Sequence, residues 1–185
     1  GNTLPTQSFK LIKDPRSKTA QADLEQQFAF LIPVRDETSK ANDAVRLIRN
    51  VRGQIEDRSA KLPADKRASF ESSAASLGTI LSAAEKAIYQ TQNRSGQDPL
   101  NYPIRLNNKI AALAGVASST DAKPTNQTLE VFRILSGELD VQLTKIRTAL
   151  NQSLPALNRD LAAAKLPAIV ESTEETKSAP SASQS

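Results

Sequence analysis

Apolar residues recur along most of the chain at spacings of three, four and seven, which is the spacing of one face of a helix. Two such segments occupy the stretch from Asn101 to Leu150, and each is opened by a proline, Pro103 or Pro124. A polar loop from Ser118 to Lys123 joins them, as expected for an antiparallel helix pair. Their apolar stripes are too wide to face water, so we expect earlier helices to pack on this pair.

Two earlier helices are predicted from the same spacing. The first extends from about Ser17 to Asp57, and Pro33 inside it favours a kink because it removes a backbone donor and crowds a carbonyl. The second begins at Pro63. The predicted buried stripe consists of Leu24, Phe28, Leu31, Thr38, Val45, Ile48 and Ile55 in the first helix, and of Phe70, Ala74, Leu77, Leu81, Ala84 and Ile88 in the second.

The fourth helix begins at Pro124 and is interrupted by Pro155, after which the apolar pattern resumes. This predicts a kink, or a short fifth helix, ending before Pro167. Together the elements predict an all-α fold, an antiparallel up-down four-helix bundle with kinked long first and fourth helices.

Both ends of the chain lack the helical pattern, so the bundle is assigned to residues 17–170. Residues 1–16 contain the β-prone piece Ser8 to Lys13, closed by Asp14-Pro15. We interpret this piece as the remnant of a preceding β domain or as an arm lying against the bundle. Residues 171–185 have no apolar periodicity and are predicted to form a disordered tail.

Composition excludes several kinds of chemistry. The 185 residues contain no His and no Cys, which removes imidazole bases, thiol nucleophiles and the usual ligands of structural zinc. The neighbouring carboxylates Asp36-Glu37 and Glu56-Asp57 point to different faces of a helix. Because calcium loops, phosphate loops and nucleophile elbows are also missing from the sequence, we expect no catalytic residue, no metal and no cofactor.

Charge and hydropathy limit the classes of partner that we expect. The net charge of +4 is mild, and the two signs alternate along the helices, which argues against nucleic acid as a partner. No apolar run reaches the roughly 18 residues of a transmembrane helix, so we expect no membrane span. The pattern does not predict the oligomeric state.

Four polar residues, Arg35, Asn42, Arg49 and Arg52, lie at or beside the predicted stripe of the first helix. Arginine heads are rarely buried without a partner, and Asp140 beside the stripe of the fourth helix is a candidate partner. We hypothesise an internal polar layer, which is either structural or an anion site.

Asn107 falls within the apolar arc of the third helix and extends this layer, since a buried amide needs hydrogen-bond partners. Its predicted role is to hold the loop from Asn93 to Asn101 or, as the alternative, to bind a ligand.

Several segments together resemble one family. They are residues 13–16, 35–54 (RDETSKANDAVRLIRNVRGQ), 101–116 (NYPIRLNNKIAALAGV) and 121–132 (DAKPTNQTLEVF). The chain is similar, from roughly Lys10 to Val170, to the C-terminal region of large bacterial sortilin-like or sialidase-like proteins, which are labelled glycosyl hydrolases and contain Asp-box repeat β-propellers. It departs from the full family pattern because it has no S-x-D-x-G-x-T-W Asp box and no Trp.

The resemblance implies an exported protein of the periplasm or cell envelope, in which this helical domain follows a propeller and a small β-sandwich. Any glycosidase site would lie outside the present chain. We therefore expect a non-catalytic accessory or interaction domain that contacts other domains of its parent chain or a protein partner. One alternative is a part of a glycoside-hydrolase unit that contributes to saccharide binding. Another is an envelope adaptor for an anionic polymer.

Overall fold

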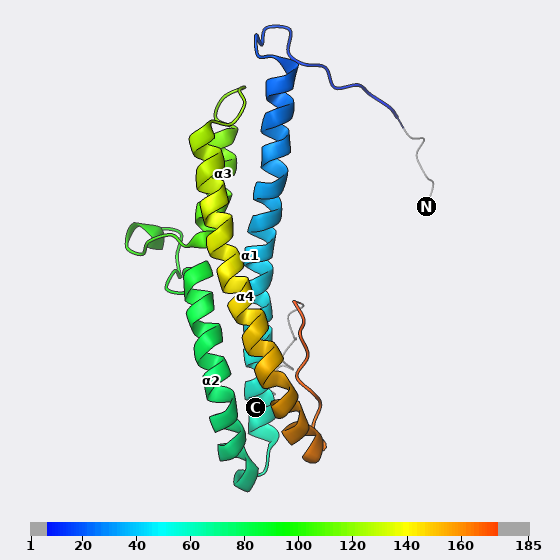
Figure 1. The fold of residues 1–185 in the computed structure, drawn as a ribbon, viewed down its shortest axis with the longest axis vertical. Coiled ribbons are helices and arrows are strands. Elements are labelled where there is room, and N and C mark those ends of the chain that lie inside the picture. Colours follow the sequence, from blue (N-terminus) through cyan, green and yellow to red (C-terminus); the bar gives the residue numbers. More distant parts are fainter. Residues whose placement is uncertain (1–6, 174–185) are drawn as a thin grey trace, which may run out of the picture.

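The computed structural model describes residues 7–173, and these residues form helices and connecting segments without a β-strand. The elements are α1 (Gln21–Lys61), α2 (Ala64–Ile88), the 3-10 turn η1 (Asp98–Leu100), α3 (Leu106–Ala117) and α4 (Asn126–Ala163). The predicted all-α fold with four helices is therefore confirmed (Figure 1).

The four helices form three antiparallel rods. Three hydrogen bonds mark the path of the chain along α1. In the second half of α1, Ser59 bonds to Glu71 and Arg49 bonds to Glu85, both of α2. Near the start of α1, Gln27 bonds to the carbonyl of Ala117, at the end of α3. Helices α2 and α3 therefore follow one another along α1, both opposite to it in direction, and α4 returns along them (Figure 1). Directions alternate from rod to rod, whereas the predicted up-down bundle alternates from helix to helix.

Apolar side chains from all four helices form one core. The predicted stripe of α2 is confirmed, because all six of its residues are buried. The stripe of α1 is wrong near its start, where Phe28 is 65% exposed and Phe30 is buried instead. The Phe30 ring packs edge-on against Phe132 of α4, with centroids 5.4 Å apart, and so joins the first rod to the third.

Both internal prolines lie within continuous helices. Helix α1 passes through Pro33, and α4 passes through Pro155 to end at Ala163, before Pro167. The short fifth helix is therefore wrong, and the two kinks stay predictions. Helix α4 begins at Asn126, shortly after the predicted start at Pro124, and the Thr125 side chain caps it by accepting a hydrogen bond from the backbone N–H of Thr128.

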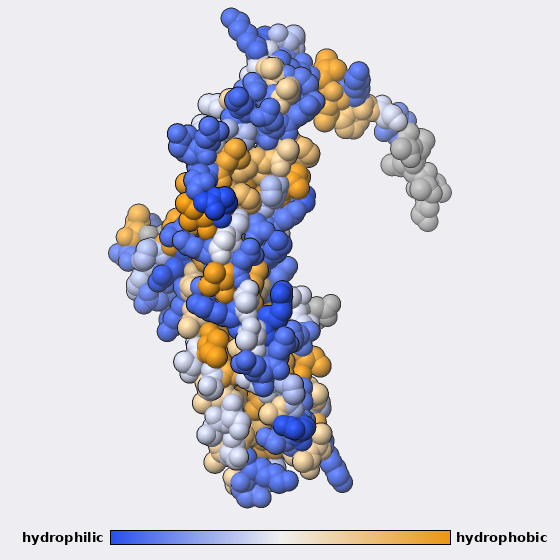
Figure 2. All heavy atoms as spheres, viewed as in Figure 1, coloured by the Kyte–Doolittle hydropathy of each residue, from blue (hydrophilic) through white to orange (hydrophobic). Residues whose placement is uncertain are grey.

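The described part of the N-terminal segment leads away from the bundle (Figure 1). Phe9, Leu11 and Ile12 are exposed, and Figure 2 shows apolar atoms gathered on this segment. Residues 1–6 and 174–185 lie outside the described residues, and so does most of the predicted disordered tail. No helix within the described range is long and apolar enough to cross a membrane.

The loop between α2 and α3 is held by its own side chains. Asp98 accepts hydrogen bonds from the backbone N–H groups of Arg94 and Ser95, and from the Ser95 hydroxyl. These bonds, the one from the Arg94 backbone first, hold the pKa of Asp98 below its usual value. The buried Gln90 amide donates to the Pro103 carbonyl at 2.8 Å and ties the two ends of the loop together.

The chain reverses direction directly after α4. Lys165 adopts a left-handed conformation with φ of 58°, and its N–H bonds to the Ala162 carbonyl. The next N–H, from Leu166, reaches back to the Leu161 carbonyl at 2.9 Å. This is the bonding of a left-handed helix cap, a position usually occupied by glycine. The reversal sends residues 166–170 back along the bundle (Figure 1).

Replacing Lys165 with glycine is expected to stabilise the fold by about 1 kcal/mol, because glycine adopts a left-handed conformation without the steric cost of a Cβ. Urea denaturation of the purified chain measures the gain. Lys165→Ala keeps the Cβ and serves as the control, with no gain expected. Equal stability of the glycine and alanine variants would contradict the assigned conformation.

Candidate interaction groove between α1 and α2

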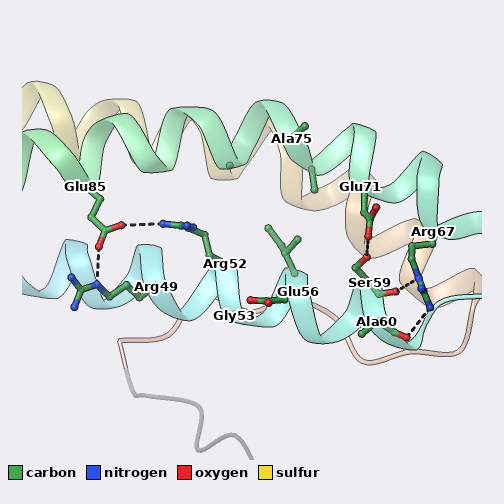
Figure 3. A pocket seen from close by; sticks show the side chains of 13 residues that line it. Arg49, Arg52, Gly53, Glu56, Ser59, Ala60, Arg67, Glu71, Ala75 and Glu85 are labelled. Atoms are coloured by element: carbon green, nitrogen blue, oxygen red, sulfur yellow. Dashed lines mark hydrogen bonds and ion pairs between the residues drawn. The ribbon is translucent and has the colours of Figure 1, made fainter. Parts of the chain in front are cut away.

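An elongated groove of about 810 Å³ lies between α1 and α2. Figure 3 shows its lining side chains spread along both helices, from Glu85 and Arg49 at one end to Arg67 and Ala60 at the other. The lining consists of Arg49, Arg52, Gly53, Ile55, Glu56, Ser59 and Ala60 from α1, and of Arg67, Glu71, Ala74, Ala75, Gly78 and Glu85 from α2.

Small residues line the middle of this groove. Gly53 comes from α1, and Ala75 and Gly78 come from α2. A Cβ added at Gly53 or Gly78 would meet no atom of the described residues within 4 Å. Glycine inside a helix costs roughly 0.5–1 kcal/mol relative to alanine. At neither position does close packing among the described residues require a glycine.

One end of the groove is closed by a three-residue ion cluster. The carboxylate of Glu85 is only 7% exposed, and it accepts a bond from Arg49 Nε at 2.7 Å and from Arg52 Nη1 at 3.1 Å. The Arg49 guanidinium also lies over the Tyr89 ring, 4.9 Å from its centroid. Both arginine side chains are about half exposed, so the cluster is a buried carboxylate beneath two cations that reach water.

The other end is organised by Arg67 of α2. Its guanidinium donates to the backbone carbonyls of Ser59, Ala60 and Leu62, at 3.0–3.1 Å. These groups end α1, and a cation there satisfies carbonyls that lack a helical partner. The Ser59 hydroxyl donates to Glu71 across the same end. Both ends of the groove are therefore fixed by bonds between α1 and α2.

The described lining carries balanced charge, with three arginines and three glutamates. A surface of this kind has no net preference for anions, since each positive group has a negative group near it. It can instead orient a partner that presents both signs.

The predicted polar layer is only partly assembled. Arg49 and Arg52 do lie beside the core and do share an acidic partner, but that partner is Glu85 of α2. Asp140 is exposed on α4, and its charge is a minor contributor to the raised pKa of Lys40, which comes first from a hydrogen bond to Glu37. Arg35 is also exposed, and it pairs with the adjacent Asp36 at 2.7 Å.

The two predicted asparagines meet at a separate place. The Asn107 amide donates to Asn42 Oδ1 at 3.3 Å and so links α3 to α1. Asn107 Oδ1 is buried and has no hydrogen-bond partner within the described part of the chain. The loop is tied down by Gln90 and Asp98, so the predicted role of Asn107 in holding it is wrong.

Glu85 is not among the site residues predicted from the sequence. It directly follows the buried Ala84 and precedes the buried Ile88 by three residues. That position at the margin of the stripe is the available signal, because a carboxylate there needs a cationic partner from a neighbouring helix.

Comparison with known proteins gave no match: no family model, no curated protein and no solved structure is significantly similar to the chain.

Proposed function

We propose that this chain is a non-catalytic interaction domain whose α1/α2 groove receives one helix of a protein partner. The observation that supports this most is the open row of small residues between two fixed ends. A groove of this kind suits the apolar seam of a helix, which approaches most closely where side chains are absent.

The length of the groove agrees with such an occupant. Its lining on α1 extends from Arg49 to Ala60, which corresponds to on the order of 16 Å at 1.5 Å per residue, or three helical turns. Charged groups of both signs stand along it, among them Glu56, Glu71 and Arg67. They would set the direction and register of an incoming helix, because like charges brought together are unfavourable.

The wider setting of this domain is also part of the proposal. The family resemblance supports an exported bacterial protein in which a β-propeller precedes these helices. The partner helix would then belong to the same envelope compartment, on another protein or on the parent chain itself.

Saccharide binding in a glycoside-hydrolase unit is the alternative, and the charged end of the groove with Arg49 and Arg52 gives it a location. Two features count against it. Both arginines already pair with Glu85, and none of the described side chains lining the groove is aromatic. Small-molecule sites are usually enclosed by large apolar and aromatic side chains.

A photocrosslinking amino acid at Ala75 tests the proposal. Ala75 is exposed in the groove, and Ala83 is an exposed alanine on the same helix outside the lining, so it provides the matched control. In envelope extract of the source cells, the Ala75 probe is expected to form one discrete protein adduct and the Ala83 probe none. Identical adducts at both positions, or binding of saccharides that competes at Ala75, would contradict the helix-binding proposal.

A further inference from the structure

The segment after α4 does not end at the helix cap. Residues 166–170 (LPAIV) run between α1 and α4, and Ile169 is buried in the core with only 2% of its surface exposed. Leu166 packs against the same core. Five residues without helical or strand structure therefore contribute two apolar anchors.

Two side-chain amides form paired hydrogen bonds with the backbone of this segment. Asn158 of α4 donates to the Ile169 carbonyl at 3.0 Å and accepts from the Ile169 N–H at 2.7 Å. Gln54 of α1 does the same for Val170, at 2.8 Å and 2.9 Å. Each amide gives the segment one donor and one acceptor, which is what a neighbouring strand offers one residue of a β-strand.

The positions of these two pairs of hydrogen bonds agree with the geometry of an extended peptide. In such a peptide the N–H and C=O of one residue point to one side, and those of the next residue point to the other. Asn158 reaches Ile169 from α4, and Gln54 reaches Val170 from α1. Each edge of the segment therefore has its own helix and its own amide.

The α1 side of this contact is a continuous polar row. Gln54 also donates to the Asn50 side chain, and Arg58 donates to the Pro167 carbonyl at 3.2 Å. Asn50, Gln54 and Arg58 are spaced by four and so share one face of α1, which is not the face of Gly53 and Glu56 in the groove.

The segment satisfies the amide of Gln54 where it is buried. With the segment in place Gln54 is 4% exposed, and its amide bonds to both the N–H and the carbonyl of Val170, as a buried amide requires. The amide positions, the Ile169 pocket and the reversed chain at Lys165 all match one extended peptide.

We propose that α1 and α4 form a binding site for an extended apolar peptide, and that its occupant is the segment 166–170 of the same chain. The site selects backbone in an extended conformation through Gln54 and Asn158, and a branched apolar side chain at the position of Ile169. It is independent of the groove on the other face of α1.

Displacement by a peptide tests this site. The full chain carrying Ile169→Asp releases its own segment, because a carboxylate is excluded from the apolar pocket. A labelled peptide of residues 164–173 is expected to bind this variant at least tenfold more tightly than the wild-type chain, whose site is filled. Adding Gln54→Ala is expected to weaken peptide binding about tenfold. Gln152→Ala, at an exposed position of α4, is the matched control without effect.

A helical Ile169→Asp chain that fails to bind the peptide, or binding indifferent to Gln54→Ala, would overturn the proposal. Hydrogen exchange of the wild-type chain provides a second readout that needs no released segment. The amides of Ile169 and Val170 are expected to exchange more than tenfold more slowly than in the free peptide, and Gln54→Ala should accelerate Val170 more than Ile169. Equal rates in chain and peptide would overturn the site. A dimer that depends on residues 166–170 would overturn the assignment to the same chain.

Discussion

Replacing Arg49 and Arg52 together by alanine is expected to destabilise the fold by about 3 kcal/mol, more than the sum of the two single changes. Either arginine alone leaves Glu85 with one charged partner, so each single change is expected to cost about 1 kcal/mol. The double change leaves a carboxylate that is 7% exposed without either of its cations. The expected loss is at the low end for a broken buried pair, since both arginine side chains are half exposed and water can approach.

Urea denaturation of the wild-type chain, both single variants and the double variant measures this coupling. Arg46→Ala is the control, because Arg46 pairs with Asp43 on the open surface and its loss is expected to cost less than about 1 kcal/mol. Strictly additive losses at Arg49 and Arg52 would show that Glu85 does not depend on them jointly.

Leu139→Ala is expected to cost about 2–5 kcal/mol. Leu139 lies in α4 with none of its surface exposed, and it packs in the core shared by the three rods. Truncation would remove apolar contacts and leave a cavity that rigid neighbouring helices cannot close.

The control for Leu139 is Val141→Ala on the same helix, at a position 51% exposed, which is expected to cost well under 1 kcal/mol. Thermal unfolding followed by circular dichroism compares the two variants. A similar small loss for both would mean that α4 does not supply the common core.

The start of the second and fourth helices could be predicted because local chemistry determines it. Pro63 and Thr125 occupy the residue before each helix, where a fixed φ or a capping hydroxyl favours initiation. The buried face at the start of α1 could not be assigned from spacing alone. Leu24 and Phe28 are four residues apart, but so are Phe30 and Val34, and only the second pair is buried. Phe28 and Phe30 lie about 200° apart around a helix of 3.6 residues per turn, so choosing one of them as buried places the other on the exposed face.

For the candidate site, the sequence predicted the position of the two arginines but not the identity of their acidic partner. The position of Arg49 and Arg52 beside the core indicated an acidic partner, but its identity depends on which helix lies on which side of α1. The apolar pattern does not show on which side of α1 each helix packs. A carboxylate on α2, such as Glu85, and one on α4, such as Asp140, were therefore equally plausible partners for the arginines. The bond between Gln54 and Val170 joins residues 116 apart in the sequence, and no local pattern indicates it.

A comparison of Gly78→Gln with Gly137→Gln tests whether the α1/α2 groove is kept open for a partner helix. Each places a long polar side chain at a helical glycine with open space, and only Gly78 lies in the groove. Both are expected to raise stability by roughly 0.5 kcal/mol, because glutamine favours helix. If a partner helix occupies the groove, Gly78→Gln abolishes the adduct formed at Ala75 and Gly137→Gln preserves it. An adduct that survives Gly78→Gln, or that is lost equally in both variants, would show that the groove does not receive a partner helix.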